Sequence, residues 1–266
     1  MLLSNLRDAI LNRLVPAPPV SYLPTRGRQV SLPQRGLAMC KPPYSKENLQ
    51  KQFHEMKDEA FWQILPEVHD FTQLPMEPMW SLYEAVRYIV AKGIKGDFVE
   101  CGVFFGGASM LIAMTLLSLK DVSRDLWLYD SFQGFVGAQA PDDVTWYGDS
   151  IKTRFADFDQ IATDNIESMG YPRERIRLVK GDIERTAADN QNGEIALLRL
   201  DTDTYHSTKA ELEHFYPKLV SGGLLIIDDY GHALGARRAT DEYFADPARR
   251  ILLHRVNFAN RIGIKL

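Results

Sequence analysis

The sequence predicts an α/β fold, in which a mostly parallel sheet is covered by helices on both faces. From residue 97 to residue 229, short apolar strands alternate five times with helical segments or turns. Such alternation is typical of parallel strands joined by crossover helices. The last two apolar segments, at residues 251–256 and 262–266, are separated by only five residues. Because that spacing leaves no room for a crossover helix, we expect an antiparallel hairpin at the end of the sheet.

The other elements follow from apolar periodicity and from helix start and stop signals. Strands are predicted at residues 97–102, 126–130, 176–180, 195–200 and 224–227. Helices are predicted at residues 45–61, 80–91, 107–119, 151–169 and 235–244. One further helix is expected to begin at Thr208, because Thr208 and Glu211 have capping-box spacing. Pro66, Pro75 and Pro78 are expected to break the chain between the first two helices.

The chain divides into a basic, proline-rich N-terminal arm and an acidic globular body. Seven of the 14 prolines lie between Pro16 and Pro43. Residues 1–43 carry six basic side chains and one acidic side chain, a net charge of 6 − 1 = +5, whereas the whole chain carries −4. We expect residues 1–75 to form an arm and helical lid or an oligomer contact, and residues 76–266 to form the main domain. The overall charge gives no indication of nucleic-acid or membrane binding.

Cysteine content and apolar segments bear on the compartment. Cys40 and Cys101 give neither a disulfide framework nor zinc-ligand spacing, so the cytoplasm is expected. Residues 1–15 carry charges inside their apolar stretch, which predicts a short amphipathic helix rather than a signal peptide. The uncharged segment 102–119 begins with glycines and is interpreted as a buried turn and helix rather than a membrane span.

The first strand ends in residues suited to a small cofactor, since ligands of open α/β sheets bind beyond the carboxyl ends of the strands. Glu100 is followed by Gly102, Gly106 and Ser109, and glycine lets the backbone approach a ligand closely. The spacing differs from the G-x-G-x-x-G pattern expected for a nicotinamide cofactor. A cofactor with a charged amino-acid tail fits better, with Glu100 accepting its ammonium group. The alternative is a glycine-rich turn that binds nothing.

The next two strands also end in acids. Asp130, followed by Ser131, could accept both hydroxyl groups of a ribose. Asp182, which follows Gly181, could accept an adenine amino group. Each acid alone could equally cap a helix, but together the three strand ends favour a cofactor that contains ribose and adenine.

Four aspartates follow the last two parallel strands. They are Asp201, Asp203, Asp228 and Asp229. If the strands are neighbours, the carboxylates repel one another unless one holds a proton or a divalent cation binds. Ligands that are all oxygen suit Mg²⁺, Ca²⁺ or Mn²⁺ rather than zinc. The alternative is that these acids cap the following helices, above all Asp203. His206 and His232 flank the cluster.

These residues resemble the macrocin O-methyltransferase family over about residues 96–266. The resemblance rests on the segments 98–103, 129–134, 198–208, 216–219, 222–223, 227–231, 235–239 and 261–263. It implies a class I methyltransferase fold, Rossmann-like, with a seven-stranded sheet and a terminal antiparallel hairpin. Residues 135–138 depart from the proline-containing loop that the family leads us to expect.

The resemblance also implies S-adenosylmethionine as cofactor and Mg²⁺ as metal, with Mn²⁺ or Ca²⁺ as alternatives. The implied metal ligands are Asp201, Asp228 and Asp229. The candidate cofactor-binding residues are Glu100, Gly102, Gly106, Ser109, Asp130, Ser131, Gly181 and Asp182. Because an alcohol is a poor nucleophile, a base is needed beside the metal, and the candidates are Asp201, then Asp203 or His206.

We therefore expect a cytoplasmic O-methyltransferase that acts on a sugar hydroxyl of a glycosylated natural product or saccharide. The alternatives are a catechol or phenol O-methyltransferase, a non-catalytic binding protein of the same fold, and a nicotinamide oxidoreductase. The expected partner is a small-molecule glycoside, with neither nucleic acid nor membrane. A homodimer or higher homo-oligomer is expected, with the basic arm covering the active site or crossing to a second subunit.

Overall fold

The computed structural model describes residues 22–25, 28–31, 46–134, 140–145 and 159–266. Four sequence predictions lie wholly or partly outside these ranges. They are the amphipathic helix at 1–15, the arm and lid at 1–75, the divergent loop at 135–138 and the first half of the helix at 151–169.

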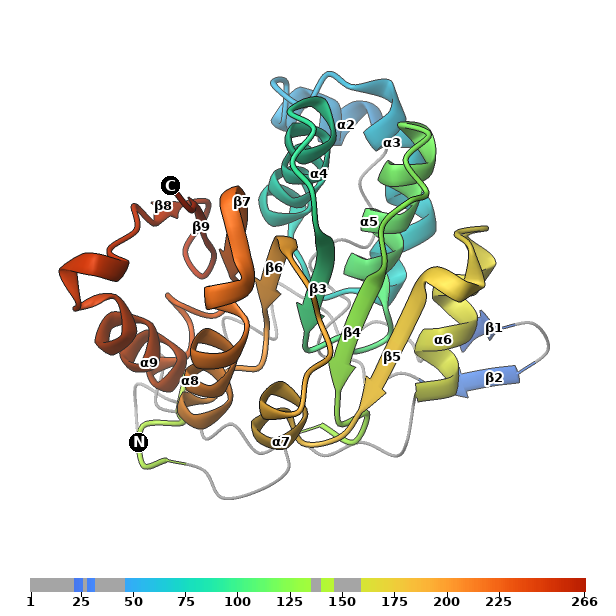
Figure 1. Cartoon of the computed structure of the whole chain (residues 1–266). Helices are drawn as coiled ribbons and strands as arrows, with labels where there is room; N and C mark the ends of the chain where they lie inside the picture. Colours follow the sequence, from blue (N-terminus) through green and yellow to red (C-terminus); the bar gives the residue numbers. More distant parts are fainter. Residues whose placement is uncertain (1–21, 26–27, 32–45, 135–139, 146–158) are drawn as a thin grey trace, which may run out of the picture.

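A seven-stranded sheet runs through the molecule, with helices on both of its faces (Figure 1). Its order is β5-β4-β3-β6-β7-β9-β8. The strands are β3 (Asp97–Cys101), β4 (Leu126–Asp130), β5 (Ile176–Lys180), β6 (Ile195–Leu200), β7 (Leu219–Ile227), β8 (His254–Arg255) and β9 (Arg261–Ile264). Strands β3 to β7 pair in parallel, whereas β9 is antiparallel to both β7 and β8. The predicted α/β fold with a terminal antiparallel hairpin is confirmed.

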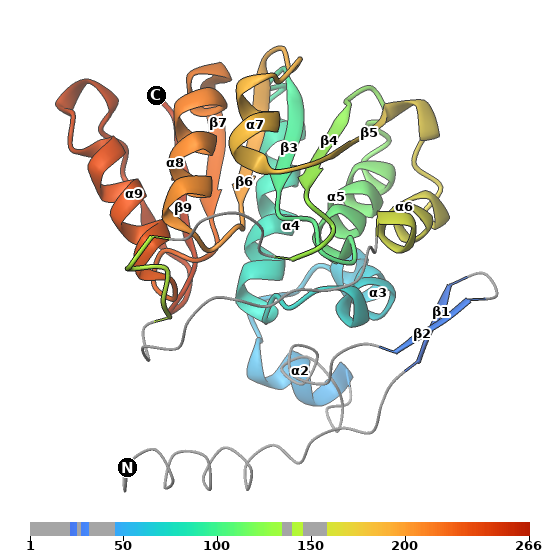
Figure 2. The same ribbon diagram turned by 90° about the horizontal axis from the view of Figure 1, so that it is seen from below.

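The helices form one layer on each face of the sheet. One face carries α4 (Met76–Ala91), α5 (Gly107–Ser118) and α6 (Asp159–Ser168), and the other carries α7 (Ile183–Ala188), α8 (Tyr205–His214) and α9 (Leu234–Phe244). Figure 2 shows the two layers edge-on, with α2 (Lys46–Gln52) and α3 (Glu59–Val68) outside the α4–α5 side. A separate antiparallel pair joins β1 (Tyr22–Thr25) to β2 (Arg28–Ser31).

Strand β6 lies at the centre of the sheet and every one of its residues is buried. Because successive side chains of a strand point to opposite faces, Leu197 packs in the core under α4 and α5, and Leu198 in the core under α7 and α8. Helix α5 is apolar on all sides because it lies between the sheet and α3. In the part of the chain described here, no helix is both long and apolar enough to span a membrane.

Two predictions about the first helices are wrong. The helix expected at 45–61 is two helices, α2 and α3, and Asp58 starts the second by accepting a hydrogen bond from the Ala60 N–H at 3.0 Å. Pro66 and Pro78 do not break the chain but lie inside α3 and α4. Pro78 is tolerated because it lies in the first turn of α4, where a backbone N–H would have no hydrogen-bond acceptor within the helix.

The start of α8 was also misplaced. The helix begins at Tyr205, and the Thr204 hydroxyl caps it by accepting from the Ser207 N–H at 3.4 Å. Thr208 lies inside the helix, since its N–H donates to the carbonyl of Thr204 at 3.1 Å. The side chain of Glu211 is therefore free for another role, and its Oε1 accepts a hydrogen bond from the Thr202 hydroxyl at 2.9 Å.

Candidate active site

A cavity of about 680 Å³ lies at the carboxyl ends of the five parallel strands. Residues from all five strand ends line it, as do a segment before α4 and the loop between β8 and β9. The lining includes residues 71–75, 102–104, 130–131, 181–184, 201–204, 228–229, 257–260 and His232. This is the place where open α/β sheets bind their ligands.

The carboxylate of Asp130 fixes the loop that follows β3. Its Oδ2 accepts hydrogen bonds from the backbone N–H groups of Val103 at 2.7 Å and Phe104 at 2.9 Å. Its Oδ1 accepts from the N–H of Phe132 at 2.7 Å. Burial raises the pKa of Asp130, although these three amides oppose the shift. The predicted cofactor residue therefore lines the cavity and is already held by the backbone around it.

The close packing of two strand ends requires a glycine directly after β3, whether or not a ligand binds there. Gly102 has a φ of +85°, and a Cβ atom there would collide with the backbone carbonyl of Asp201 on the neighbouring strand. This contact brings the ends of β3 and β6 together at the cavity.

Other predicted cofactor residues line the same cavity. Ser131 donates its hydroxyl hydrogen to the carbonyl of Gly134 at 2.7 Å. Asp182 caps α7 by accepting from the N–H of Glu184 at 3.1 Å, and Gly181 lies beside it.

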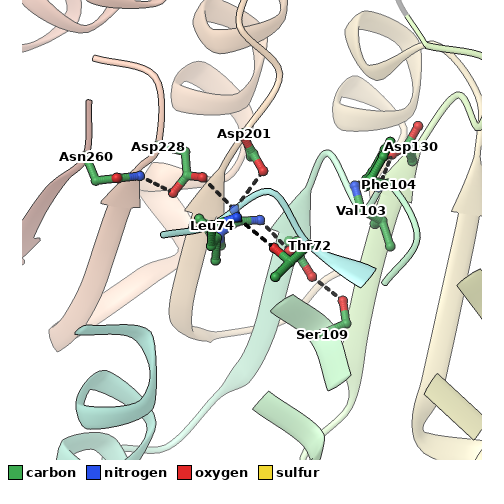
Figure 3. A network of polar contacts seen from close by, with 11 residues as sticks. Thr72, Leu74, Val103, Phe104, Ser109, Asp130, Asp201, Asp228 and Asn260 are labelled. Carbon is green, nitrogen blue, oxygen red and sulfur yellow. Dashed lines mark hydrogen bonds and ion pairs between the residues drawn. The ribbon is translucent and has the colours of Figure 1, made fainter. Parts of the chain in front are cut away.

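In the wall of the cavity, a buried arginine joins residues from three strands. The guanidinium of Arg199 on β6 pairs through Nη1 with Glu100, its register partner on β3. Its Nη2 donates to Asp201 Oδ2 and to Asp228 Oδ2, each at 2.6 Å. In Figure 3, the carboxylates of Asp201 and Asp228 both point toward the same nitrogen atom, which is this Nη2. Burial by itself would lower the pKa of Arg199, but the surrounding carboxylates raise it well above its ordinary value.

The network continues at both ends. The second oxygen of Glu100 accepts a hydrogen bond from the hydroxyl of Ser109 on α5. The second oxygen of Asp228 accepts from Nδ2 of Asn260, in the loop before β9, at 2.6 Å (Figure 3). Arg199 and Asn260 were missed by the sequence analysis. An arginine within an otherwise apolar strand, two residues before an aspartate, is the signal that could have revealed the first.

Among the residues that the structure describes, two further carboxyl groups face each other without a basic partner. Asp203 has a φ of +62° and its side chain is hydrogen-bonded to that of Asp229. Burial and the charge of Asp201 raise the pKa of Asp203 to about 7. Burial and the charge of Asp203 raise the pKa of Asp229, whose Oδ2 is buried and has no hydrogen-bond partner. The predicted clustering of the four aspartates is therefore present.

Not every predicted residue lies on the cavity wall. Glu100, Gly106 and Ser109 lie behind it rather than among the lining residues. His206 is exposed on α8, with its ring 5.2 Å from that of Tyr205. His232 does line the cavity, and burial lowers its pKa.

The donor chemistry of the acidic end fits a hard divalent cation. Within the described residues, three carboxyl groups share one guanidinium, Asp203 and Asp229 have no basic partner, and the Oδ2 atom of Asp229 is buried without a hydrogen-bond partner. Their positions do not form a ready-made metal site. Among the residues that the structure describes, no three His, Cys, Asp or Glu side chains are placed to bind one ion together. Asp201 and Asp228 instead turn to Arg199.

The sheet order and the cavity define a class I methyltransferase fold. The O-methyltransferase NovP superposes with a TM-score of 0.65 at 25% identity, over 73% of this chain and 82% of that one. The calicheamicin methyltransferase CalS11 superposes with a TM-score of 0.62 at 22% identity, over 83% and 93% of the two chains.

The sequence assigns the chain more narrowly. Residues 45–256 match the pattern of the macrocin-O-methyltransferase (TylF) family, so the chain belongs to that family of S-adenosylmethionine-dependent O-methyltransferases. The 8-demethyl-8-(2,3-dimethoxy-alpha-L-rhamnosyl)-tetracenomycin-C 4'-O-methyltransferase of Streptomyces olivaceus is 33% identical over 60% of this chain and 62% of its own length. The mycinamicin III 3''-O-methyltransferase of Micromonospora griseorubida is 31% identical over 65% of this chain and 69% of its own. The chain thus matches about three fifths of the length of the first relative.

Proposed function

We propose that this protein transfers a methyl group from S-adenosylmethionine to a sugar hydroxyl of a glycosylated natural product or saccharide. One observation carries the proposal. A single cavity joins Asp130 and Asp182, suited to a nucleoside, to the acidic residues Asp201, Asp228 and Asp229. The names of the two relatives, which refer to a rhamnosyl tetracenomycin and to mycinamicin III, support a glycosylated acceptor.

The cofactor end uses residues that the fold already holds in place. Asp130 keeps about one acceptor site for a ribose hydroxyl group, since a carboxylate offers about four and three are used. Asp182 lies at the end of the next strand, as an acceptor for the adenine amino group. Glu100 supplies negative charge for the ammonium group from behind the wall. The methyl carbon then faces the acidic end.

The acidic end activates the acceptor. The acceptor oxygen attacks the methyl carbon, the carbon–sulfur bond breaks with its electron pair passing to sulfur, and a carboxylate takes the hydroxyl proton. Asp201 is the first candidate for that base, with Asp203 next, while His206 is less suited because it is exposed outside the cavity. Asp201, Asp228 and Asp229 would hold Mg²⁺, with Mn²⁺ or Ca²⁺ as alternatives. A bound divalent ion would lower the pKa of the acceptor hydroxyl and orient it.

Two broader expectations belong to the same proposal. We expect a cytoplasmic homodimer or higher homo-oligomer, in which residues 1–75 cover the site or reach a second subunit. Residues 76–266 form the methyltransferase domain, although the cavity also uses residues 71–75 from the preceding segment.

The direct test is a methyl-transfer assay on the purified full chain. S-adenosylmethionine is supplied with a panel of rhamnosylated macrolides, simple glycosides, vicinal diols and catechols, and products are scored by mass. We expect a mass gain of one methyl group on a glycoside, loss of turnover in EDTA, and recovery on adding Mg²⁺. Methylation of catechols alone would favour the phenol-specific alternative. Absence of both product and S-adenosylmethionine binding would refute the proposal, and full activity in EDTA would refute its metal.

A further inference from the structure

The side chain of Arg199 touches both ends of the cavity. It lies on the central strand and is only 3% exposed. Its Nη1 pairs with Glu100, which lies behind the wall of the proposed cofactor end, and its Nη2 pairs with Asp201 and Asp228, which line the acidic end. One planar, permanently charged group therefore links the two ends.

Three carboxylates compete for this one positive charge. In the weakly screened interior, charge removed from one carboxylate changes how strongly the guanidinium interacts with the others. Asp201 is the most open of the three, at 29% exposure, whereas Glu100 is 1% exposed. A ligand in the cavity that binds Asp201 can thus change the interaction between Arg199 and the buried Glu100.

Stability alone does not account for the arginine. Burying an ion network carries a desolvation cost that its attractions barely offset, and apolar replacements of whole networks are often neutral or stabilising. The neighbours Leu197 and Leu198 on the same strand are both fully buried. An apolar residue at position 199, with apolar partners, would suit the core equally well.

We propose that Arg199 is a positioning residue that couples the two ends of the cavity. The inference rests on the proposed function, since it uses the cofactor and cation ends assigned there. A divalent cation at Asp201 and Asp228 draws their charge away from the guanidinium, which then neutralises Glu100 more fully. Glu100 attracts the cofactor's ammonium group less strongly, so the cation weakens cofactor binding. By linkage, the cofactor weakens cation binding by the same factor.

The test is calorimetric titration of S-adenosylhomocysteine, which retains the ammonium group, into the full chain. Each protein is titrated once in EDTA and once in excess Mg²⁺, and the ratio of the two Kd values is compared. For the wild type we expect Mg²⁺ to raise Kd about fivefold or more. For Arg199→Met the ratio is expected to fall below about twofold, and for Arg199→Lys to lie between, because a lysine keeps the charge but lacks the planar fork.

Leu198→Ala is the matched control. It lies on the same strand with its side chain in the opposite core, and it is expected to lower Tm while keeping the wild-type ratio. An unchanged ratio in Arg199→Lys contradicts the coupling even if Arg199→Met does not fold. A wild-type ratio of one contradicts it as well, including when Mg²⁺ does not bind. Failure of the wild type to bind S-adenosylhomocysteine instead counts against the proposed function itself.

Discussion

The two ends of the cavity differ in how their carboxylates are satisfied. At the cofactor end, Asp130 accepts three backbone hydrogen bonds and Asp182 accepts one. At the acidic end, Asp203 and Asp229 face each other with no basic partner in the described ranges, where one oxygen of Asp229 is also buried without a hydrogen-bond partner.

The difference indicates which end is complete in itself. Backbone amides belong to the fold, so the cofactor end is organised before any ligand arrives. Unpaired buried carboxylates are costly, and a protein retains them where a proton or a cation compensates. In the part of the chain that the structure describes, the acidic end is therefore the one at which a proton or a cation would compensate the carboxylates.

The largest effect is expected from removing one charge at the acidic end. Asp201→Asn should lower kcat by about 10²–10⁴-fold, because it removes the proposed base and a proposed cation ligand. Binding of S-adenosylhomocysteine should persist, since the amides that hold Asp130 are untouched. Steady-state kinetics and calorimetry measure the two properties, with Asp189→Asn, an exposed residue outside the cavity, as control. Loss of cofactor binding would show that the two ends were wrongly assigned.

The corresponding change at the cofactor end should act mainly on affinity. Asp130→Asn places an amide NH₂ where an oxygen now accepts hydrogen bonds. Leaving buried amides unsatisfied is expected to cost about 1–3 kcal/mol of stability and to weaken S-adenosylhomocysteine binding about tenfold or more. Urea unfolding and calorimetry test this together. Wild-type affinity for S-adenosylhomocysteine in this variant would mean that Asp130 only supports the loop and does not bind the cofactor.

The strand ends could be predicted because each acid directly follows an apolar strand, and parallel strands end at one edge of the sheet. The helix starts were harder. Thr202 and Thr204 precede α8, and the structure shows that Thr204 is the cap and that Thr208 lies inside the helix, with Glu211 bonded to Thr202.

The link between the two ends could not be predicted in the same way. Arg199 and Glu100 are 99 residues apart in the chain, and only the register of β3 with β6 brings them together. Asn260 reaches Asp228 through the loop before the last strand, whose partner β8 has only two residues. Periodicity identifies elements, whereas such contacts depend on how the elements pair.

A smaller effect is expected where the segment before α4 packs against the cofactor end. A Cβ atom on Gly107 would lie 2.5–2.6 Å from backbone atoms of Phe71 and Thr72, which line the cavity. Gly107→Ala should therefore destabilise the protein by about 1–3 kcal/mol. Gly193→Ala is the matched control, because its methyl group would meet no heavy atom within 4 Å. Equal urea midpoints for the two variants would show that the backbone at Phe71 and Thr72 can move to accept the methyl group without loss of stability.

The last effect, which appears only as a pH dependence, concerns a carboxyl group beneath the acidic end. Glu211 is fully buried, and its Oε2 has no hydrogen-bond partner. Burial raises its pKa well above the ordinary value of 4.5. Because the folded chain holds this proton and the unfolded chain releases it, stability falls as pH rises above 4.5, until the pH passes the folded pKa. The slope for one proton is about 1.4 kcal/mol per pH unit at most.

Glu211→Gln keeps the shape of the side chain without the ionisation. Its urea midpoint should therefore decline less between pH 5 and pH 8 than that of the wild type, both measured in EDTA. Glu213→Gln, which changes an exposed residue of the same helix, should follow the wild type. Equal declines in all three proteins would mean that Glu211 ionises freely in the folded chain. Glu211 would then add its own negative charge beneath the acidic end, and the contrast in charge between the two ends would be larger than the burial of Glu211 indicates.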